Sequence, residues 1–414
     1  MGIRIDYIPM SHSHEHPEIQ VSARVRTALT VAVVPFVVAT LTGLVLLWPS
    51  DTKVLTQAEL PTDLIDGEVT GVTPIECRGE GSGEVGCQSI DVRLDEGSQK
   101  GRSVGIELVD DASSPQLEIG DDIVVAYAPD AVEELKYYFA DFQRKPPLIA
   151  LGVLFAIFVV LLGRWRGVAA LAGFAISLAI LIWFVLPAIL QGTSPLLVSI
   201  TGASAVMLVA LYMAHGVNVR TTTALLGTFA SLALTGGLAY LFVEIARLSG
   251  FSSEEAFFLR ASAEQVNLQG LVLGGIIIGS LGVLDDVTIT QASAVWELHI
   301  ANPAYGFKQI YRSALRIGRD HIASTVNTLV LAYAGAALPL LVLFSLAETR
   351  IGDVLNGEIV AEEIVRTLVG SIGLVAAVPI TTALAAFVVV RRDPAEDADD
   401  PQEDETRQGF WGAD

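Results

Sequence analysis

Long apolar stretches separated by short polar segments are the dominant pattern of this 414-residue chain. A helix needs about 20 apolar residues to cross the roughly 30 Å of hydrocarbon in a bilayer. Eight windows come close to this requirement, so the sequence predicts an α-helical polytopic membrane protein with about eight transmembrane helices. The windows cover residues 27–48, 147–163, 167–190, 195–215, 221–243, 268–296, 322–347 and 365–390.

Residues 67–128 follow a different pattern. Runs such as SIDVRL and DDIVVAYA alternate apolar and polar positions and are separated by Gly-rich or Asp/Ser-rich turns. This alternation is typical of β-strands with one buried face. Four or five such strands predict a small extracytoplasmic β domain, barrel or OB-like, inserted between helices 1 and 2. Residues 129–142 are expected to form an amphipathic helix at the outer membrane interface.

Basic residues beside the windows predict the orientation, because Lys and Arg are enriched in cytoplasmic loops. They fall mostly on alternate sides, which makes both termini cytoplasmic and residues 49–146 extracytoplasmic. The bases that set this orientation are Arg24, Arg26, Arg164, Arg166, Arg220, Lys308, Arg312, Arg316, Arg319, Arg391 and Arg392. Arg144, Lys145, Arg247, Arg260 and Arg350 fall on the outer side and weaken the bias.

The predicted spans divide the chain into five parts. The first span lacks a signal-peptide cleavage pattern and is interpreted as an uncleaved anchor in a bacterial cell membrane. The parts are a cytoplasmic tail (1–26), the first span (27–48), the β domain with its linker (49–146), a seven-helix membrane domain (147–390) with a cytoplasmic basic helix at 305–320, and an acidic disordered tail (391–414).

The net charge of −21 is concentrated outside the apolar windows. Residues 50–143 hold 21 acidic and 6 basic side chains, and residues 393–414 hold nine acids and one base. Nucleic-acid binding requires clustered cations along the phosphates. The sequence therefore predicts no nucleic-acid partner.

Two adjacent carboxylates, Asp285 and Asp286, lie inside the window 268–296. A charge at the centre of a spanning helix costs roughly 2.5 to 3.5 kcal/mol on insertion scales, so such residues are usually functional. If the span ended with the apolar run at Leu284, both would lie at a helix end. If it ends at Trp296, a residue typical of membrane interfaces, Asp285 lies about 16 Å inside the membrane.

The second boundary is favoured by the spacing of polar residues on this helix. Asp286, Thr290, Ser293 and Glu297 share one face at i, i+4, i+7 and i+11. A polar stripe in a span needs a protein or water partner. We therefore predict that Asp285 and Asp286, with Thr290 and Ser293, belong to an ion- or proton-coupling site.

The start of the next window supplies candidate partners. Arg319 and His321 stand at its cytoplasmic mouth, and Thr325 and Thr328 continue inward from His321 on one face. Asn327 belongs to the same segment. A carboxylate and an arginine whose separation changes between two states would make a proton switch. The alternative interpretation is a structural polar cluster that holds the two spans together.

Cys77 and Cys87 are the only cysteines and both fall on the predicted outer side, where disulfides persist. The segment CRGEGSGEVGC is predicted to be a disulfide-closed hairpin tip; two unpaired thiols are the alternative. A metal site is not predicted. The segment HSHEH, which contains His12, His14 and His16, is interpreted as a solvated tail rather than a metal ligand set.

A basic stripe of Lys308, Arg312 and Arg316 precedes the seventh window. Such a stripe attracts anionic lipid headgroups, although the bias for positive charge on the cytoplasmic side also explains it.

The motif GVLDDVTITQA and the downstream block SALRIGRDHIASTVNT resemble the YibE/F family of bacterial multi-pass membrane proteins. The resemblance covers the architecture from the first window to the eighth and implies a topology rather than a mechanism. In pattern, the sixth and seventh windows are also similar to the proton-coupled half-repeat of SecF and the RND superfamily. There, an Asp pairs with an Arg and a Thr/Ser patch on the next helix, but here TITQASAVWELH replaces the run that follows the aspartate.

These features favour a proton- or ion-coupled transporter, or a translocation accessory protein, over two alternatives. One alternative is a non-catalytic scaffold whose β domain binds an envelope partner. The other, an intramembrane aspartyl hydrolase, needs two carboxylates on facing helices, whereas Asp285 and Asp286 point about 100° apart on one helix. We expect no enzyme activity and no cofactor. Small-residue helix faces also make a homo-oligomer plausible.

Overall fold

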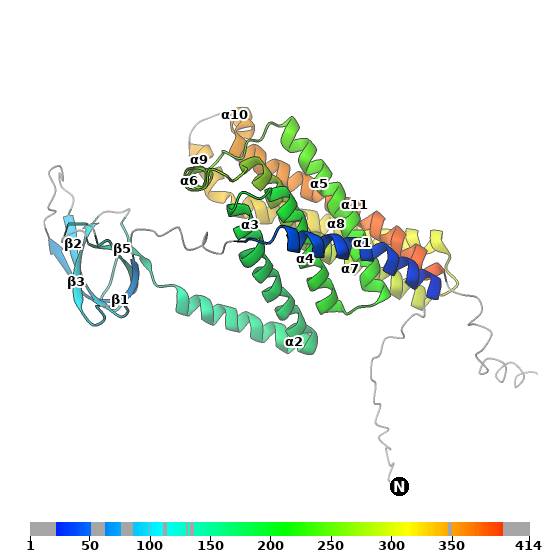
Figure 1. Ribbon diagram of the computed structural model, residues 1–414, viewed down its shortest axis with the longest axis horizontal. Helices are drawn as coiled ribbons and strands as arrows, with labels where there is room; N and C mark the ends of the chain where they lie inside the picture. Colours follow the sequence, from blue (N-terminus) through cyan, green and yellow to red (C-terminus); the bar gives the residue numbers. More distant parts are fainter. Residues whose placement is uncertain are drawn as a thin grey trace, which may run out of the picture. The chain divides into compact units, whose positions relative to one another are not determined.

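The computed structural model describes residues 22–50, 63–75, 86–97, 99–110, 114–129, 131–132, 136–346 and 350–391. The chain divides into two compact units, coloured along the sequence in Figure 1. One unit, Asp51–Val168, contains the β domain and the first part of a long helix. The other, Met1–Ser50 with Ala169–Asp414, contains the remaining helices.

The β domain is a single antiparallel sheet with strand order β3-β2-β1-β4-β5. The sheet curls until its edge strands β3 and β5 contact each other (Figure 1). The predicted β domain is therefore confirmed as a small curled sheet. The strands are β1 Asp63–Ile75, β2 Gly86–Leu94, β3 Ser103–Asp110, β4 Asp122–Tyr127 and β5 Tyr137–Phe142.

Alternate residues of these strands fill the interior of the curled sheet. Val69, Ile90, Leu94, Ile123 and Val125 are all fully buried there. Their period of two is the pattern that predicted strands from the sequence.

The amphipathic helix expected at residues 129–142 is wrong over its second half. Residues Tyr137–Phe142 form strand β5, which pairs with β4. Aromatic residues favour strands, and the Tyr127 and Tyr137 rings lie 5.0 Å apart across the pair. Pairing with the preceding strand β4 therefore decides the structure of this segment.

Cys87 is buried at the start of β2, beside Ile75 of β1. Cys77 lies outside the described residues, so its pairing with Cys87 stays a prediction.

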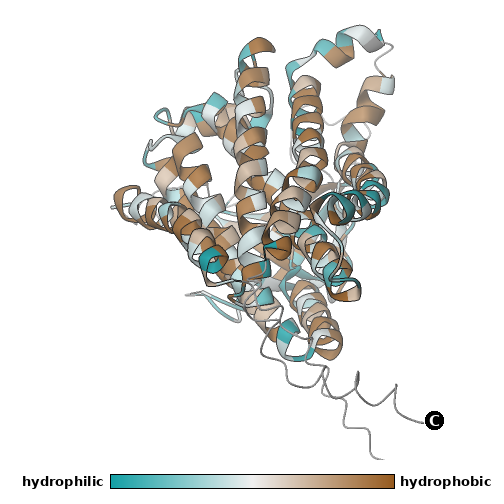
Figure 2. Cartoon of the chain, turned by 90° about the vertical axis from the view of Figure 1, so that its right-hand side faces the viewer, coloured by the Kyte–Doolittle hydropathy of each residue, from teal (hydrophilic) through white to brown (hydrophobic). Residues whose placement is uncertain are grey.

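The described residues include six helices that are long and apolar enough to cross a membrane, or seven if the bent pair α8 and α9 is one span. Figure 2 shows hydrophobic residues on the outside of these helices, as expected for surfaces that face lipid. The helices are α1 Ala23–Leu46, α2 Lys145–Ile180 continued by η3 Leu181–Val185 and α3 Leu186–Leu190, α4 Pro195–His215, α5 Val219–Ile245, α6 Glu254–Ser262, α7 Leu268–Ala301, α8 Phe307–Ala336, α9 Leu338–Leu346, α10 Ile351–Asn356 and α11 Glu358–Val390.

The segment Lys145–Leu190 spans 46 residues. At 1.5 Å per residue it would extend about 69 Å, roughly twice the thickness of the hydrocarbon core. Its helical path is interrupted at Arg164, which has φ 50° and ψ −130°. The segment is long enough for two crossings, with the interruption at the basic turn that the sequence places between the second and third windows.

Helix α8 joins two elements that the sequence predicts separately, the basic helix at 305–320 and the first part of the window 322–347. The window is not straight, because α8 ends at Ala336 and α9 continues at an angle of 61°.

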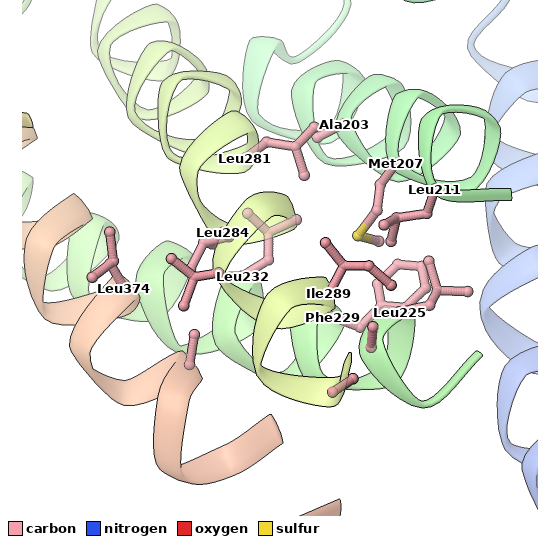
Figure 3. Close-up of a cluster of buried hydrophobic side chains, with 14 of the residues drawn as sticks. Ala203, Met207, Leu211, Leu225, Phe229, Leu232, Leu281, Leu284, Ile289 and Leu374 are labelled. Atoms are coloured by element: carbon pink, nitrogen blue, oxygen red, sulfur yellow. The ribbon is translucent and has the colours of Figure 1, made fainter. Parts of the chain in front are cut away.

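Helix α7 packs against α4, α5, α8 and α11 and lies at the centre of the helical unit. Figure 3 shows its residues Leu281, Leu284 and Ile289 among side chains of the neighbouring helices, including Met207 of α4 and Phe229 of α5. A carboxyl group on α7 is therefore positioned by four other helices.

Close approach of the helices depends on glycines that meet hydroxyl groups. A Cβ at Gly227 of α5 would overlap the hydroxyl of Thr381 on α11. Eight residues along, a Cβ at Gly373 of α11 would overlap the hydroxyl of Thr235 on α5. Small residues of this kind allow membrane helices to pack at short distance.

Candidate functional site

Helix α7 places Asp285 at its midpoint. The helix begins after Asn267, whose side chain accepts a hydrogen bond of 2.8 Å from Gly270 N, and it ends at Ala301. Asp285 is therefore about 25 Å from either end. Trp296, expected at the membrane interface, is instead buried against α8 and α11, so it does not mark a lipid-facing boundary.

The two aspartates differ in their surroundings. Asp285 is half-buried, and its Oδ1 is buried without a hydrogen-bond partner among the described residues. Asp286 is exposed. Adjacent helical residues point about 100° apart, so only one of the two faces the helix core. Asp285 is the carboxyl that the fold encloses.

The predicted polar face of α7 points away from the packed core. Thr290 and Glu297 are exposed together with Asp286. Ser293 is half-buried, and its hydroxyl donates to Ile289 O at 2.8 Å. The spacing correctly groups these residues on one face, but their partner does not lie in the described part of this chain.

A second polar face of α7, which the sequence analysis missed, is buried. The hydroxyl oxygens of Thr288 and Thr228 of α5 lie 2.6 Å apart. Gln291 Nε2 donates to Ala314 O of α8 at 2.9 Å and to Thr382 Oγ1 of α11 at 2.7 Å. Ser280, Thr288 and Gln291 follow one another at i, i+8 and i+11, a spacing visible in the sequence. The partners of Thr288 and Gln291 on other helices were not visible there.

The candidates on α8 also divide between two faces. His321 and Thr325 are half-buried, and Thr325 Oγ1 donates to His321 O at 2.9 Å. His321 Nε2 is buried and, like Asp285 Oδ1, has no hydrogen-bond partner among the described residues. Arg319, Asn327 and Thr328 are exposed.

The depth of the α7 candidates relative to the α8 candidates follows from the hydrogen bond between Gln291 and Ala314. Helices α7 and α8 are consecutive and antiparallel, so six residues back from Gln291 corresponds to six residues forward from Ala314. Asp285 therefore lies at the depth of residues 320 and 321. No ion pair or hydrogen bond joins Asp285 or Asp286 to Arg319 or His321 among the described residues. The expected Asp–Arg pair is thus not formed within the described chain.

The remaining sequence candidates are placed as follows. Lys308, Arg312 and Arg316 are exposed on one side of α8, opposite buried Ile310 and Ala314. Within the described ranges no group of three His, Cys, Asp or Glu side chains is placed to hold a metal ion. The HSHEH segment lies outside those ranges.

The long apolar helices, the curled β domain and a half-buried carboxyl at the midpoint of the central helix indicate a polytopic helical membrane protein. Comparison with protein families matches residues 151–391 to the YibE/F-like protein family. This match covers more than half of the chain, and the chain belongs to that family. The resemblance inferred from GVLDDVTITQA is therefore confirmed. No curated protein and no solved structure matches the chain.

Proposed function

We propose that the chain is a multi-pass protein of the bacterial plasma membrane that couples proton or ion movement to transport or translocation. The observation that carries this proposal is Asp285, a half-buried carboxyl at the midpoint of the central helix, whose buried Oδ1 has no hydrogen-bond partner in the part of the chain that the structure describes. Ionisable groups at such positions are rare in membrane proteins and mark ion or proton pathways. Family membership supports a membrane protein and leaves its activity open.

The proposed topology has eight spans, both termini in the cytoplasm and residues 49–146 outside. Two features support the count. Lys145–Leu190 is long enough for two crossings and broken at Arg164, and α8 with α9 supplies one bent span. The basic residues Arg164, Arg220 and Arg316 would then all lie on the cytoplasmic side.

In this proposal Asp285 is the carboxyl that takes up and releases the proton, and His321 belongs to the same polar site. Each presents a buried atom that no described residue pairs with, at about the same depth on adjacent helices. A lone charge is costly in apolar surroundings, whereas a proton on the carboxyl, or a charge on both groups, relieves that cost. A movement of α8 relative to α7 would then be linked to protonation.

The test is proton uptake into vesicles reconstituted with the full chain, with a pH-sensitive dye inside and an imposed membrane potential. Asp285→Asn should abolish dye-reported uptake at wild-type abundance, because an amide cannot exchange a proton. Glu297→Gln is the matched control, an exposed acid on the same helix, and it should retain uptake. Equal uptake by wild type, Asp285→Asn and empty vesicles would refute proton coupling.

The second candidate function is a scaffold whose outer domain binds an envelope partner. It is favoured by apolar side chains that the β domain leaves exposed, such as Leu64 and Ile119. The two functions separate in cells lacking the native protein. Loss of complementation by Asp285→Asn supports coupling, whereas loss by Leu64→Ser with Asp285→Asn unaffected supports the scaffold.

A further inference from the structure

One face of α7 is exposed over more than four turns. Gly275, Gly279, Gly282, Asp286 and Thr290 follow one another at intervals of three or four residues, and all are exposed. A Cβ at Gly275 or Gly282 would meet no atom within 4 Å. The stripe is therefore a flat, small-residue surface that leads directly to a carboxylate.

Lipid is an unfavourable cover for this face. A charged side chain that faces hydrocarbon costs several kcal/mol unless a polar group or water reaches it. The second predicted span of the same chain, residues 147–163, is one alternative cover for this face. It contains no polar side chain that could pair with Asp286. The occupant must therefore bring polar or basic groups of its own.

The neighbouring helix α8 exposes a complementary stripe. Arg316, Arg319, Ser324 and Asn327 are exposed at intervals of three to five residues. By the antiparallel register of Gln291 with Ala314, Asp286 lies at the depth of Arg319, five residues from each reference position. One molecule thus carries an acid and a base at one depth, both exposed and not paired with each other.

We propose that a second copy of this chain covers the stripe in a two-fold dimer, with Asp286 of each chain facing the partner's Arg319. A two-fold axis along the membrane normal preserves depth and makes each contact occur twice. Gly275 and Gly282, where nothing of the same chain lies within 4 Å of a Cβ, allow the helices to approach closely. The dimer supplies the arginine partner that the sequence predicts for the carboxylate pair and that the single chain does not.

The first test is cross-linking in native membranes. Gly282→Cys lies on the stripe, and Ile372→Cys is the matched control. Helices α7 and α11 run parallel, with Gln291 beside Thr382. The exposed Ile372, ten residues before Thr382, therefore lies at about the depth of Gly282, nine residues before Gln291. A short bifunctional maleimide should give several-fold more dimer with Gly282→Cys than with Ile372→Cys or with the wild-type chain. Equal yields from the two variants would overturn the proposal.

The second test uses charge reversal with two differently tagged copies. Asp286→Arg or Arg319→Glu alone should reduce co-purification of the tags several-fold, because like charges then face each other twice. Co-expression of Asp286→Arg with Arg319→Glu should restore co-purification, because each site in the mixed dimer again joins opposite charges.

Rescue by the double variant in one chain, without rescue between two single-variant chains, would place the pair within one molecule and refute the dimer. If charge reversal lowers abundance, single-molecule photobleaching of the wild-type chain in vesicles decides the question. Two bleaching steps are expected, and a uniform single step would refute the proposal.

Discussion

Gln291 joins three helices through one amide group. Its Nε2 donates to Ala314 O of α8 and to Thr382 Oγ1 of α11. We expect Gln291→Leu to lower the free energy of unfolding by roughly 1 to 3 kcal/mol, because two buried interhelical hydrogen bonds are lost. Thermal unfolding in detergent checks this. Thr290→Val, one residue earlier and exposed, is the control, and an equal midpoint for the two variants would contradict the prediction.

The residues of α7 show which parts of the candidate site the sequence could predict. The spacing of Asp286, Thr290 and Glu297 predicted a shared face correctly. The depth of Asp285 in a membrane stays a prediction, because Trp296, the boundary on which it rested, is buried. Which face is buried could not be predicted, because the lipid side and the packed side of a membrane helix are both apolar. The buried partners of Thr288 and Gln291 lie 60 and 91 residues away, beyond the reach of any local pattern.

At the scale of elements, the packing of α5 against α11 depends on a glycine with no room for a side chain. A Cβ at Gly227 would overlap Thr381, whereas a Cβ at Gly237 on the same helix would meet nothing within 4 Å. We expect Gly227→Val to reduce stability by about 1 to 3 kcal/mol through overpacking. Gly237→Val should differ little from wild type in the same thermal unfolding experiment, and a loss of equal size would show that valine itself, not the contact, is responsible.

The elements themselves divide by how local their determinants are. The long helices were predictable because each apolar window carries its own signal. Strand β5 was not, because its ladder and the Tyr127–Tyr137 ring pair depend on β4. The bend between α8 and α9 was equally hidden, since the window 322–347 is apolar on both sides of it.

At the scale of the whole molecule, the proposed topology predicts which sites a membrane-impermeant thiol reagent can reach. Lys100→Cys in the β domain should be labelled in intact cells. Ala304→Cys, in the short turn between α7 and α8, should be labelled only after permeabilisation. Both positions are exposed, so access rather than burial decides the outcome. The wild-type chain gives the background from Cys77 and Cys87, and the reverse labelling pattern would invert the topology.

The contact between α5 and α11 has a reciprocal form. Gly227 of α5 receives Thr381 of α11, and two turns away Gly373 of α11 receives Thr235 of α5. Each helix therefore contributes one glycine and one threonine to the contact. Sliding one helix along the other, in either direction, would move both threonine hydroxyls away from the glycines at once. The helices α5 and α11 therefore form a rigid pair. In a transport cycle we expect the moving part to be the end of α8 beyond Gly318 with its bent continuation α9, because Gly318 itself receives Val378 of α11 and holds the start of α8 against that helix.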